Sequence, residues 1–181
     1  EAREARRLGD SAKALRVLWN ELERVTAHVF DIGNMGGMGT GFSFMAAQGF
    51  RMVEELRRMH DEIIGHRFMR GAILLGGARD VSKTEIEKIQ STLSAVEKSL
   101  KEVLHIAFNN DGLMERFETT GILTHDEAIA YGARGLPARA SGVEREMEIE
   151  HRTQEFCRTT REKVQSLTCT EFRELWAKIA R

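Results

Sequence analysis

Apolar residues recur at helical spacing along the first two thirds of the chain and predict long helices. The first helix starts near Asp10-Ser11, either of which suits an N-cap, and stops at Gly33. Its apolar positions follow the i, i+3, i+4 pattern: Leu15, Leu18, Leu22 and Val25. A second helix is expected over about residues 42–64, ending at Gly65, a residue typical of helix C-termini. Residues 65–81 are expected to form an irregular loop or a short apolar strand at 72–75.

The third predicted helix carries the clearest local signals. Ser82 and Glu85 have the spacing of a capping box, in which each side chain bonds the other residue's backbone N–H. A narrow apolar stripe follows in alternating steps of three and four: Ile86, Ile89, Leu93, Val96, Leu100, Val103 and Ala107. A stripe of this kind predicts a neighbouring helix within a bundle. Residues 109–112 (NNDG) are expected to end this helix.

The rest of the chain reads as shorter elements. Thr124 and Glu127 form a second capping box, which opens a short helix that closes at Gly132. Residues 132–142 read as a loop that contains Pro137. A polar helix is expected from about residue 144, and a last one from about 168 with an apolar face of Phe172, Leu175, Trp176 and Ile179. The fold class is therefore mainly α, a long-helix bundle with irregular Gly/Arg-rich loops.

Composition narrows the class of protein. The 181 residues include one proline, far below the usual share of about 5%, which favours long helices. A length of this order suits a single domain, 1–181, with 41% hydrophobic residues to build a core. A net charge of -1 argues against nucleic-acid binding. No apolar run approaches the roughly 18 residues of a transmembrane helix.

Two patterns suggest chemistry, and each has a simpler explanation. The glycines at 33–41 could hold a phosphate at a helix N-terminus, but no Walker-type Lys follows and no strand precedes them. A flexible or closely packed helix connection is the favoured interpretation. The pairs Glu102/His105 and Glu148/His151 have the spacing of ligands in di-iron bundles. However, Glu102 and His105 lie off the apolar stripe, and the second pair lies in a charged run, so a metal site is disfavoured.

Histidine and arginine residues form the other candidates. His28 lies on the first helix and is expected to be a packing residue. Several arginines lie on glycine-rich loops: Arg67, Arg70, Arg79, Arg134, Arg139 and Arg145. Because a guanidinium makes bidentate bonds, such residues either anchor a loop within the domain or line a cleft or a subunit interface. The residues alone favour neither alternative.

Several stretches together resemble a known family. They are RVLWNELER (16–24) with His28, DIGNM (31–35), GFSFMAAQ (41–48), GHR (65–67), GGAR (76–79), and TTGILTHDEAIAYGARGLPARASGV (119–143) with the charged tail to His151. In order and spacing they resemble the large subunits of nickel–iron hydrogenases and the 49 kDa subunit of respiratory complex I. Within that family, GHR and GFSFMAAQ are closest to the energy-converting, formate-hydrogenlyase-type branch. The resemblance covers roughly residues 14–155.

The resemblance implies a mostly helical domain of an oxidoreductase subunit that takes part in electron transfer beside an iron–sulfur partner subunit. It implies a peripheral location on the cytoplasmic face of a membrane complex. The full assembly would use a nickel–iron centre, 4Fe–4S clusters, quinone or NAD. Positions carried over as cavity-wall or interface residues are Glu21, Arg24, His28, Arg67, Gly76, Gly77, Arg139, Ser141, Gly142 and Arg145. None of them is expected to be catalytic.

The chain also departs from the family pattern. The family binds nickel and iron through two CxxC motifs, whereas this chain has two cysteines, Cys157 and Cys169, in no such motif. Met38-Gly39 stands where the family has an Asp, Val53-Glu54 where it has Arg-Glu, and Glu146 and Glu148 where it has Asp and Arg. The histidine and tyrosine that meet quinone belong to a family region before this chain begins. We therefore expect either an internal piece of a longer subunit or a member that has lost the metal. The chain is expected to be inactive alone and to bind no cofactor by itself, with a structural or assembly module as the alternative.

Overall fold

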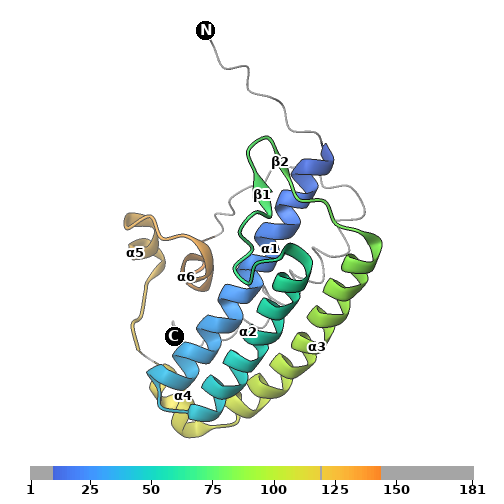
Figure 1. Ribbon diagram of the computed structural model, residues 1–181. Helices are drawn as coiled ribbons and strands as arrows, with labels where there is room; N and C mark the ends of the chain where they lie inside the picture. Colours follow the sequence, from blue (N-terminus) through green and yellow to red (C-terminus); the bar gives the residue numbers. More distant parts are fainter. Residues whose placement is uncertain (1–9, 119, 144–181) are drawn as a thin grey trace.

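Three long helices form the main layer of the molecule in this computed structural model, which describes residues 10–118 and 120–143 (Figure 1). They are α1 (Asp10–Gly33), α2 (Ser43–Ile64) and α3 (Lys83–Phe108). α2 packs against both α1 and α3 and so lies between them. The predicted mainly helical bundle is confirmed. None of the helices in the described ranges has the length and apolar character needed to cross a membrane.

The core is built from the apolar faces that the sequence pattern predicts. α1 contributes Leu22, Val25 and Val29, and α3 contributes Ile89 to Ala107 at the expected steps, all nearly inaccessible to solvent. The Ser82–Glu85 capping box is formed, with both reciprocal bonds present. Gly65 ends α2 in the left-handed conformation at φ 84°. These local signals thus place all three long helices correctly.

The glycine cluster lies at the junction of α1 and α2, where the two helices come into backbone contact. Residues Asn34–Gly39 form one stretch of π-helix, labelled η1. A Cβ built on Gly49 of α2 would lie 2.5 Å from the Cα of Gly33. At Gly37 it would lie 2.2 Å from the Cβ of Ala46. Close packing of the connection is therefore confirmed, although the π-helix was not expected.

A small hairpin follows α2. Strand β1 (Ile73–Leu74) pairs antiparallel with β2 (Gly77–Ala78), with Ile73 opposite Ala78. Gly76 in the turn has φ 79°, a value that favours glycine. The short apolar strand expected at 72–75 is present, and its partner strand was not predicted.

Three short helices complete the described part: α4 (Asp111–Phe117), α5 (His125–Ala130) and α6 (Gly135–Ala140). The Thr124–Glu127 capping box of α5 is confirmed. The loop predicted over 132–142 is wrong, because α6 lies within it and Pro137 falls in its first turn, where proline is tolerated. The expected stop at 109–112 is only half right, because the side chain of Asn110 caps a new helix, α4. The helices expected from 144 and 168 lie outside the described residues.

The short C-terminal helices have their own small core. Ala128, Ala138 and Val143 form a second buried cluster, separate from that of the long helices. Figure 1 shows α5 and α6 beside the bundle, close to each other.

Candidate functional site

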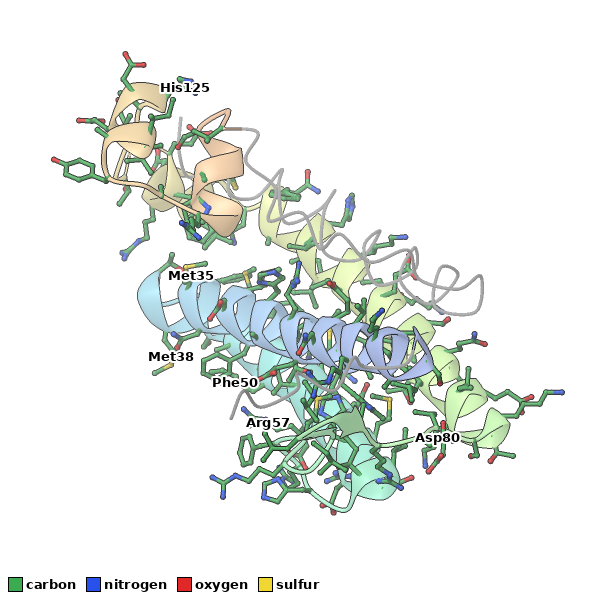
Figure 2. All side chains as sticks on the ribbon, turned by 90° about the horizontal axis from the view of Figure 1, so that it is seen from above. Met35, Met38, Phe50, Arg57, Asp80 and His125 are labelled. Atoms are coloured by element: carbon green, nitrogen blue, oxygen red, sulfur yellow. The ribbon has the colours of Figure 1, made fainter. Side chains whose placement is uncertain are left out.

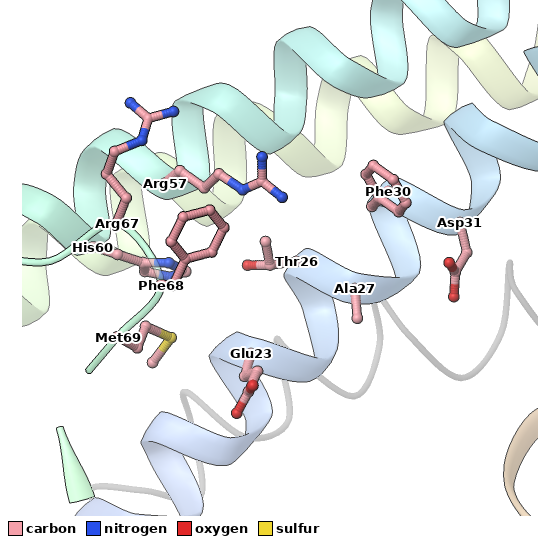
Figure 3. Close-up of a pocket in the computed structure, with 10 residues that line it drawn as sticks. All are labelled: Glu23, Thr26, Ala27, Phe30, Asp31, Arg57, His60, Arg67, Phe68 and Met69. Carbon is pink, nitrogen blue, oxygen red and sulfur yellow. The ribbon is translucent and has the colours of Figure 1, made fainter. Parts of the chain in front are cut away.

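A pocket opens between the C-terminal halves of α1 and α2 and the loop that follows α2 (Figure 3). Its volume is about 220 Å³. Apolar, basic and acidic side chains all line it: Glu23, Thr26, Ala27, Phe30, Asp31, Arg57, His60, Arg67, Phe68 and Met69. Residues from three segments, α1, α2 and the loop that follows α2, therefore line the pocket.

The loop is held in place by a charged clamp. Arg67 donates two hydrogen bonds to the carboxylate of Glu54, at 3.1 Å to Oε1 and 2.5 Å to Oε2. Arg58 donates a third to Oε1 at 3.0 Å. Hydrogen bonding by Arg67, and then by Arg58, lowers the pKa of Glu54 to about 2. This clamp fixes the residue next to Phe68, and so fixes one wall of the pocket.

His60 lines the pocket and is only 2% exposed. Burial lowers its pKa to about 4, although a hydrogen bond with the Arg67 backbone opposes this shift. Its Nε2 has no hydrogen-bond partner among the described residues. His60 is therefore neutral near pH 7, because the protonated ring would lose its hydration without gaining a carboxylate.

Arg57 differs from Arg51 and Arg58 on α2, because no carboxylate in the described part of the chain pairs with it. Its guanidinium lies over the ring of Phe68, with Cζ 5.0 Å from the ring centre. Its Nε is buried without a hydrogen-bond partner in the described part of the chain. Figure 3 shows the guanidinium reaching across the pocket toward Phe30. The cation is thus supported by an aromatic face but not neutralised.

The hairpin is anchored to α1 by side chains that reach its backbone. Arg16 donates to the carbonyl of Gly77 at 3.0 Å and to that of Leu74 at 2.6 Å. Trp19 Nε1 donates to the carbonyl of Arg79 at 3.2 Å. Gly76 and Gly77, both carried over from the family resemblance, therefore belong to a turn that hydrogen bonds from Arg16 attach to α1.

The predicted residues of the first helix lie elsewhere. Glu21 is 3% exposed and pairs with Arg24 at 3.0 Å. His28 is half-buried, and its side chain is not free of interactions. None of the three lines the pocket.

Ser141 and Gly142 follow α6, and Ser141 connects this segment to the start of α5 through hydrogen bonds. Ser141 Oγ donates to the carbonyl of Leu123 at 2.9 Å, and the Ser141 carbonyl lies 3.2 Å from His125 Nδ1. Gly142 has φ 81°. Arg139 belongs to α6 but its side chain is not described, and Arg145 lies outside the described residues. Of the eight predicted positions whose side chains the structure describes, Arg67 alone lines this pocket, and the roles of all ten stay predictions.

The described residues do not fit a resident metal. No group of three or more His, Cys, Asp or Glu side chains within 10–118 and 120–143 could hold an ion. Glu102 and His105 are exposed on α3, so the di-iron pairing fails there. Cys157 and Cys169, like Glu148 and His151, lie outside the described residues.

Sequence reasoning missed the residues that build the pocket, above all Arg57, His60 and Phe68. One signal was present: His60 continues the buried face of α2 one turn after Leu56, where an apolar residue is expected. Nothing comparable marks Arg57, because its environment depends on a loop that returns to the helix.

Comparisons with known proteins agree with the resemblance. Residues 37–166 match the family model described as respiratory-chain NADH dehydrogenase, 49 kDa subunit. The chain is 32% identical over 137 residues to an NADH-quinone oxidoreductase subunit of Myxococcus xanthus, covering 75% of this chain and 32% of that protein. It is 30% identical over 149 residues to the corresponding protein of Streptomyces coelicolor, covering 82% of this chain and 33% of that protein. It is 26% identical over 136 residues to that of Akkermansia muciniphila, covering 75% and 33%. The chain spans about a third of the length of these relatives.

Proposed function

Because the chain belongs to the family of the respiratory-chain NADH dehydrogenase 49 kDa subunit, we propose that it acts as one domain of a redox assembly. In this proposal it takes part in electron transfer beside an iron–sulfur partner subunit. The observation that carries the proposal is the family match over residues 37–166. The proposed location is peripheral, on the cytoplasmic face of the cell membrane, as the family resemblance implies.

The contribution of this domain is positional in the proposal. The described residues supply a rigid helical scaffold, a clamped loop at Arg67 and an anchored turn at Gly76-Gly77. Buried or bidentate contacts of this kind fix geometry, which electron transfer between neighbouring centres requires. A nickel–iron centre takes four thiolates in this family, so its ligands would come from elsewhere in the subunit.

Two reaction types belong to the proposal and are separated by assay. GHR (65–67) and GFSFMAAQ (41–48) favour the formate-hydrogenlyase-type branch, whereas the relatives named above are NADH-quinone oxidoreductase subunits. The test is to purify the tagged protein, with whatever assembles on it, from membranes of its native host. Hydrogen uptake, NADH-dependent quinone reduction, nickel, iron and the iron–sulfur signal in electron paramagnetic resonance are then measured.

We expect iron–sulfur signals and one of the two activities in the assembly, and neither activity in the isolated 181-residue chain. An assembly without iron–sulfur clusters would contradict the proposal. So would stoichiometric nickel or turnover in the isolated chain.

A structural module without redox chemistry is the second candidate. It is favoured by Val53, which is 2% exposed in the core where the family has Arg, and by Met38-Gly39 in place of the family's Asp. Arg67→Met, which breaks the clamp to Glu54, separates the two candidates. If the domain shapes a redox site, turnover per assembled complex falls. If it is only a scaffold, the amount of complex falls and turnover per complex stays constant.

A further inference from the structure

Among the described residues, the pocket between α1 and α2 holds one arginine, Arg57, with which no carboxylate pairs. On the same helix, Arg58 shares Glu54 with Arg67, and Arg51 is paired with Glu55. Arg57 has no carboxylate in ion-pair contact among the described residues, and neighbouring Asp61 does not supply one. A buried guanidinium N–H without an acceptor is costly, so the site gains from an acceptor that comes from outside.

The walls around this cation are aromatic and open to solvent. Phe68 is 62% exposed and Phe30 is 37% exposed. Phe50 extends the surface, because its ring lies 5.5 Å from that of Phe30. Figure 2 shows Phe50 and Arg57 along the same side of the helix pair. Exposed aromatic side chains grouped around a pocket are typical of binding surfaces.

The size of the pocket decides between two kinds of occupant. Small-molecule sites usually occupy about 300–1,000 Å³. This pocket, at about 220 Å³, is smaller and open, which suits a single side chain of a protein partner. Protein interfaces concentrate their binding energy in such sockets, where aromatic and arginine residues are enriched.

We infer that this pocket is a docking socket for a partner polypeptide that places a carboxylate on Arg57 and an apolar side chain between Phe30 and Phe68. Because Arg57 is positively charged and no described carboxylate pairs with it, the partner residue that complements it is acidic. The carboxylates of Glu23 and Asp31 point away from Arg57 (Figure 3), so they leave its guanidinium open while disfavouring a polyanion. The partner segment therefore pairs one acidic residue with an apolar neighbour. This inference rests on the proposed function in one respect, namely that the chain works within an assembly.

The test uses two probe peptides, acetyl-Gly-Asp-Phe-Gly-amide and the same peptide with Asn in place of Asp. Binding to the isotope-labelled chain is followed by NMR through backbone amides and the arginine Nε–H groups. We expect binding of the acidic peptide on the order of millimolar, because so short a peptide loses much of its own freedom. Its shifts should centre on Arg57, Phe30 and Phe68, and the Asn peptide should bind about tenfold more weakly, as for loss of a charge-assisted hydrogen bond.

Three variants make the assignment specific. Arg57→Met should bring the affinity of the acidic peptide down to that of the Asn peptide. Arg51→Met, the matched control on the same helix, removes an arginine that pairs with Glu55 and belongs to neither the pocket nor the clamp, and should leave both affinities within about twofold. Phe30→Ser should weaken both peptides equally and keep their ratio, which tests the apolar wall while the Phe68 ring under the cation stays in place. Thermal unfolding of each variant checks that the helices are intact.

Equal binding of the two peptides would overturn the inference, as would shifts that spread over other faces. Benzoate binding at Arg57 as tightly as the peptide would assign the pocket to small carboxylates instead. The outcome is independent of electron transfer. An assembly that lacks redox activity but still requires Arg57 to form would contradict the proposed function alone. Absence of the expected peptide binding would contradict the docking socket alone.

Discussion

The contact between Gly33 and Gly49 makes a direct prediction about stability. Gly49→Ala places a methyl group where the space is filled by the opposite backbone. The added Cβ would lie 2.5 Å from Gly33 Cα and 3.1 Å from Gly33 N, whereas carbon atoms pack best at about 3.5–4.0 Å. No rotamer relieves this clash, because both the methyl group and its obstacle are fixed to helix backbones. α1 and α2 must therefore move apart and loosen the core between them.

The expected change in the free energy of unfolding is opposite in sign to the usual effect of a Gly→Ala substitution in a helix. In a helix interior, Gly→Ala normally stabilises by about 0.8–1 kcal/mol. Overpacking costs about 1–3 kcal/mol, and a rigid backbone obstacle places this site at the upper end. We therefore expect Gly49→Ala to lower the free energy of unfolding by about 2 kcal/mol and Tm by roughly 4–8 °C.

The assay is urea unfolding of the full chain followed by far-UV circular dichroism, with Gly112→Ala as the control. A Cβ at Gly112 on α4 meets only Asn110 Oδ1, at 3.6 Å, so this variant should be neutral or slightly more stable. Gly33→Ala should resemble Gly49→Ala, and the double variant should cost less than the sum because both act at one crossing. A Gly49→Ala protein as stable as the wild type, or more stable, would refute the close-contact argument.

Other predictions concern single side chains. Ser82→Ala removes the cap of α3 and should cost about 1 kcal/mol in urea unfolding, whereas Ser91→Ala within the same helix should change stability by less than about 0.5 kcal/mol. His60 has a pKa of about 4 in the folded chain against 6.5 without the fold, so the unfolded chain takes up the proton first as pH falls. Its contribution is complete above pH 6.5 and is lost toward pH 4, by up to about 3 kcal/mol, and unfolding measured across this range should be flatter in His60→Phe. Glu54 has a pKa of about 2 in the folded chain against an ordinary value of 4.5, so it contributes stability above pH 4.5 that is lost as pH falls toward 2. Glu54→Gln should therefore make the free energy of unfolding depend less on pH in this acid range. A carboxyl NMR titration of Glu54 with an ordinary midpoint would contradict the clamp.

The long helices could be predicted because their signals are local. Capping at Ser82, the apolar stripe of α3 and the stop at Gly65 each depend on residues within one or two turns. The same locality explains the errors. Asn110 is typical of the end of one helix, yet its side chain also caps the next, and Pro137 is typical of a loop, yet it occupies a first helical turn.

The pocket could not be predicted because distant segments build it. Arg67 meets Glu54 across 13 residues of sequence, and Phe68 of the loop lines the same pocket as Phe30 of α1. A glycine-rich loop with arginines leaves anchoring and cleft-lining as equal alternatives. Arg67 shows that one residue does both, since its guanidinium anchors the loop while the residue lines the pocket.

The partners of Glu54 explain why no carboxylate of α2 is left for Arg57 among the described residues. Val53, the residue before Glu54, is 2% exposed within the core and contributes packing but no charge. Glu54, one residue on, faces the loop and already holds Arg58 and Arg67. Two guanidinium groups thus share one carboxylate. Arg57 points to the other side of the helix, toward α1, where Phe68 offers an aromatic face but no negative charge. The clamp that orders the loop and the open cation of the pocket are therefore two results of the same placement of charges on α2.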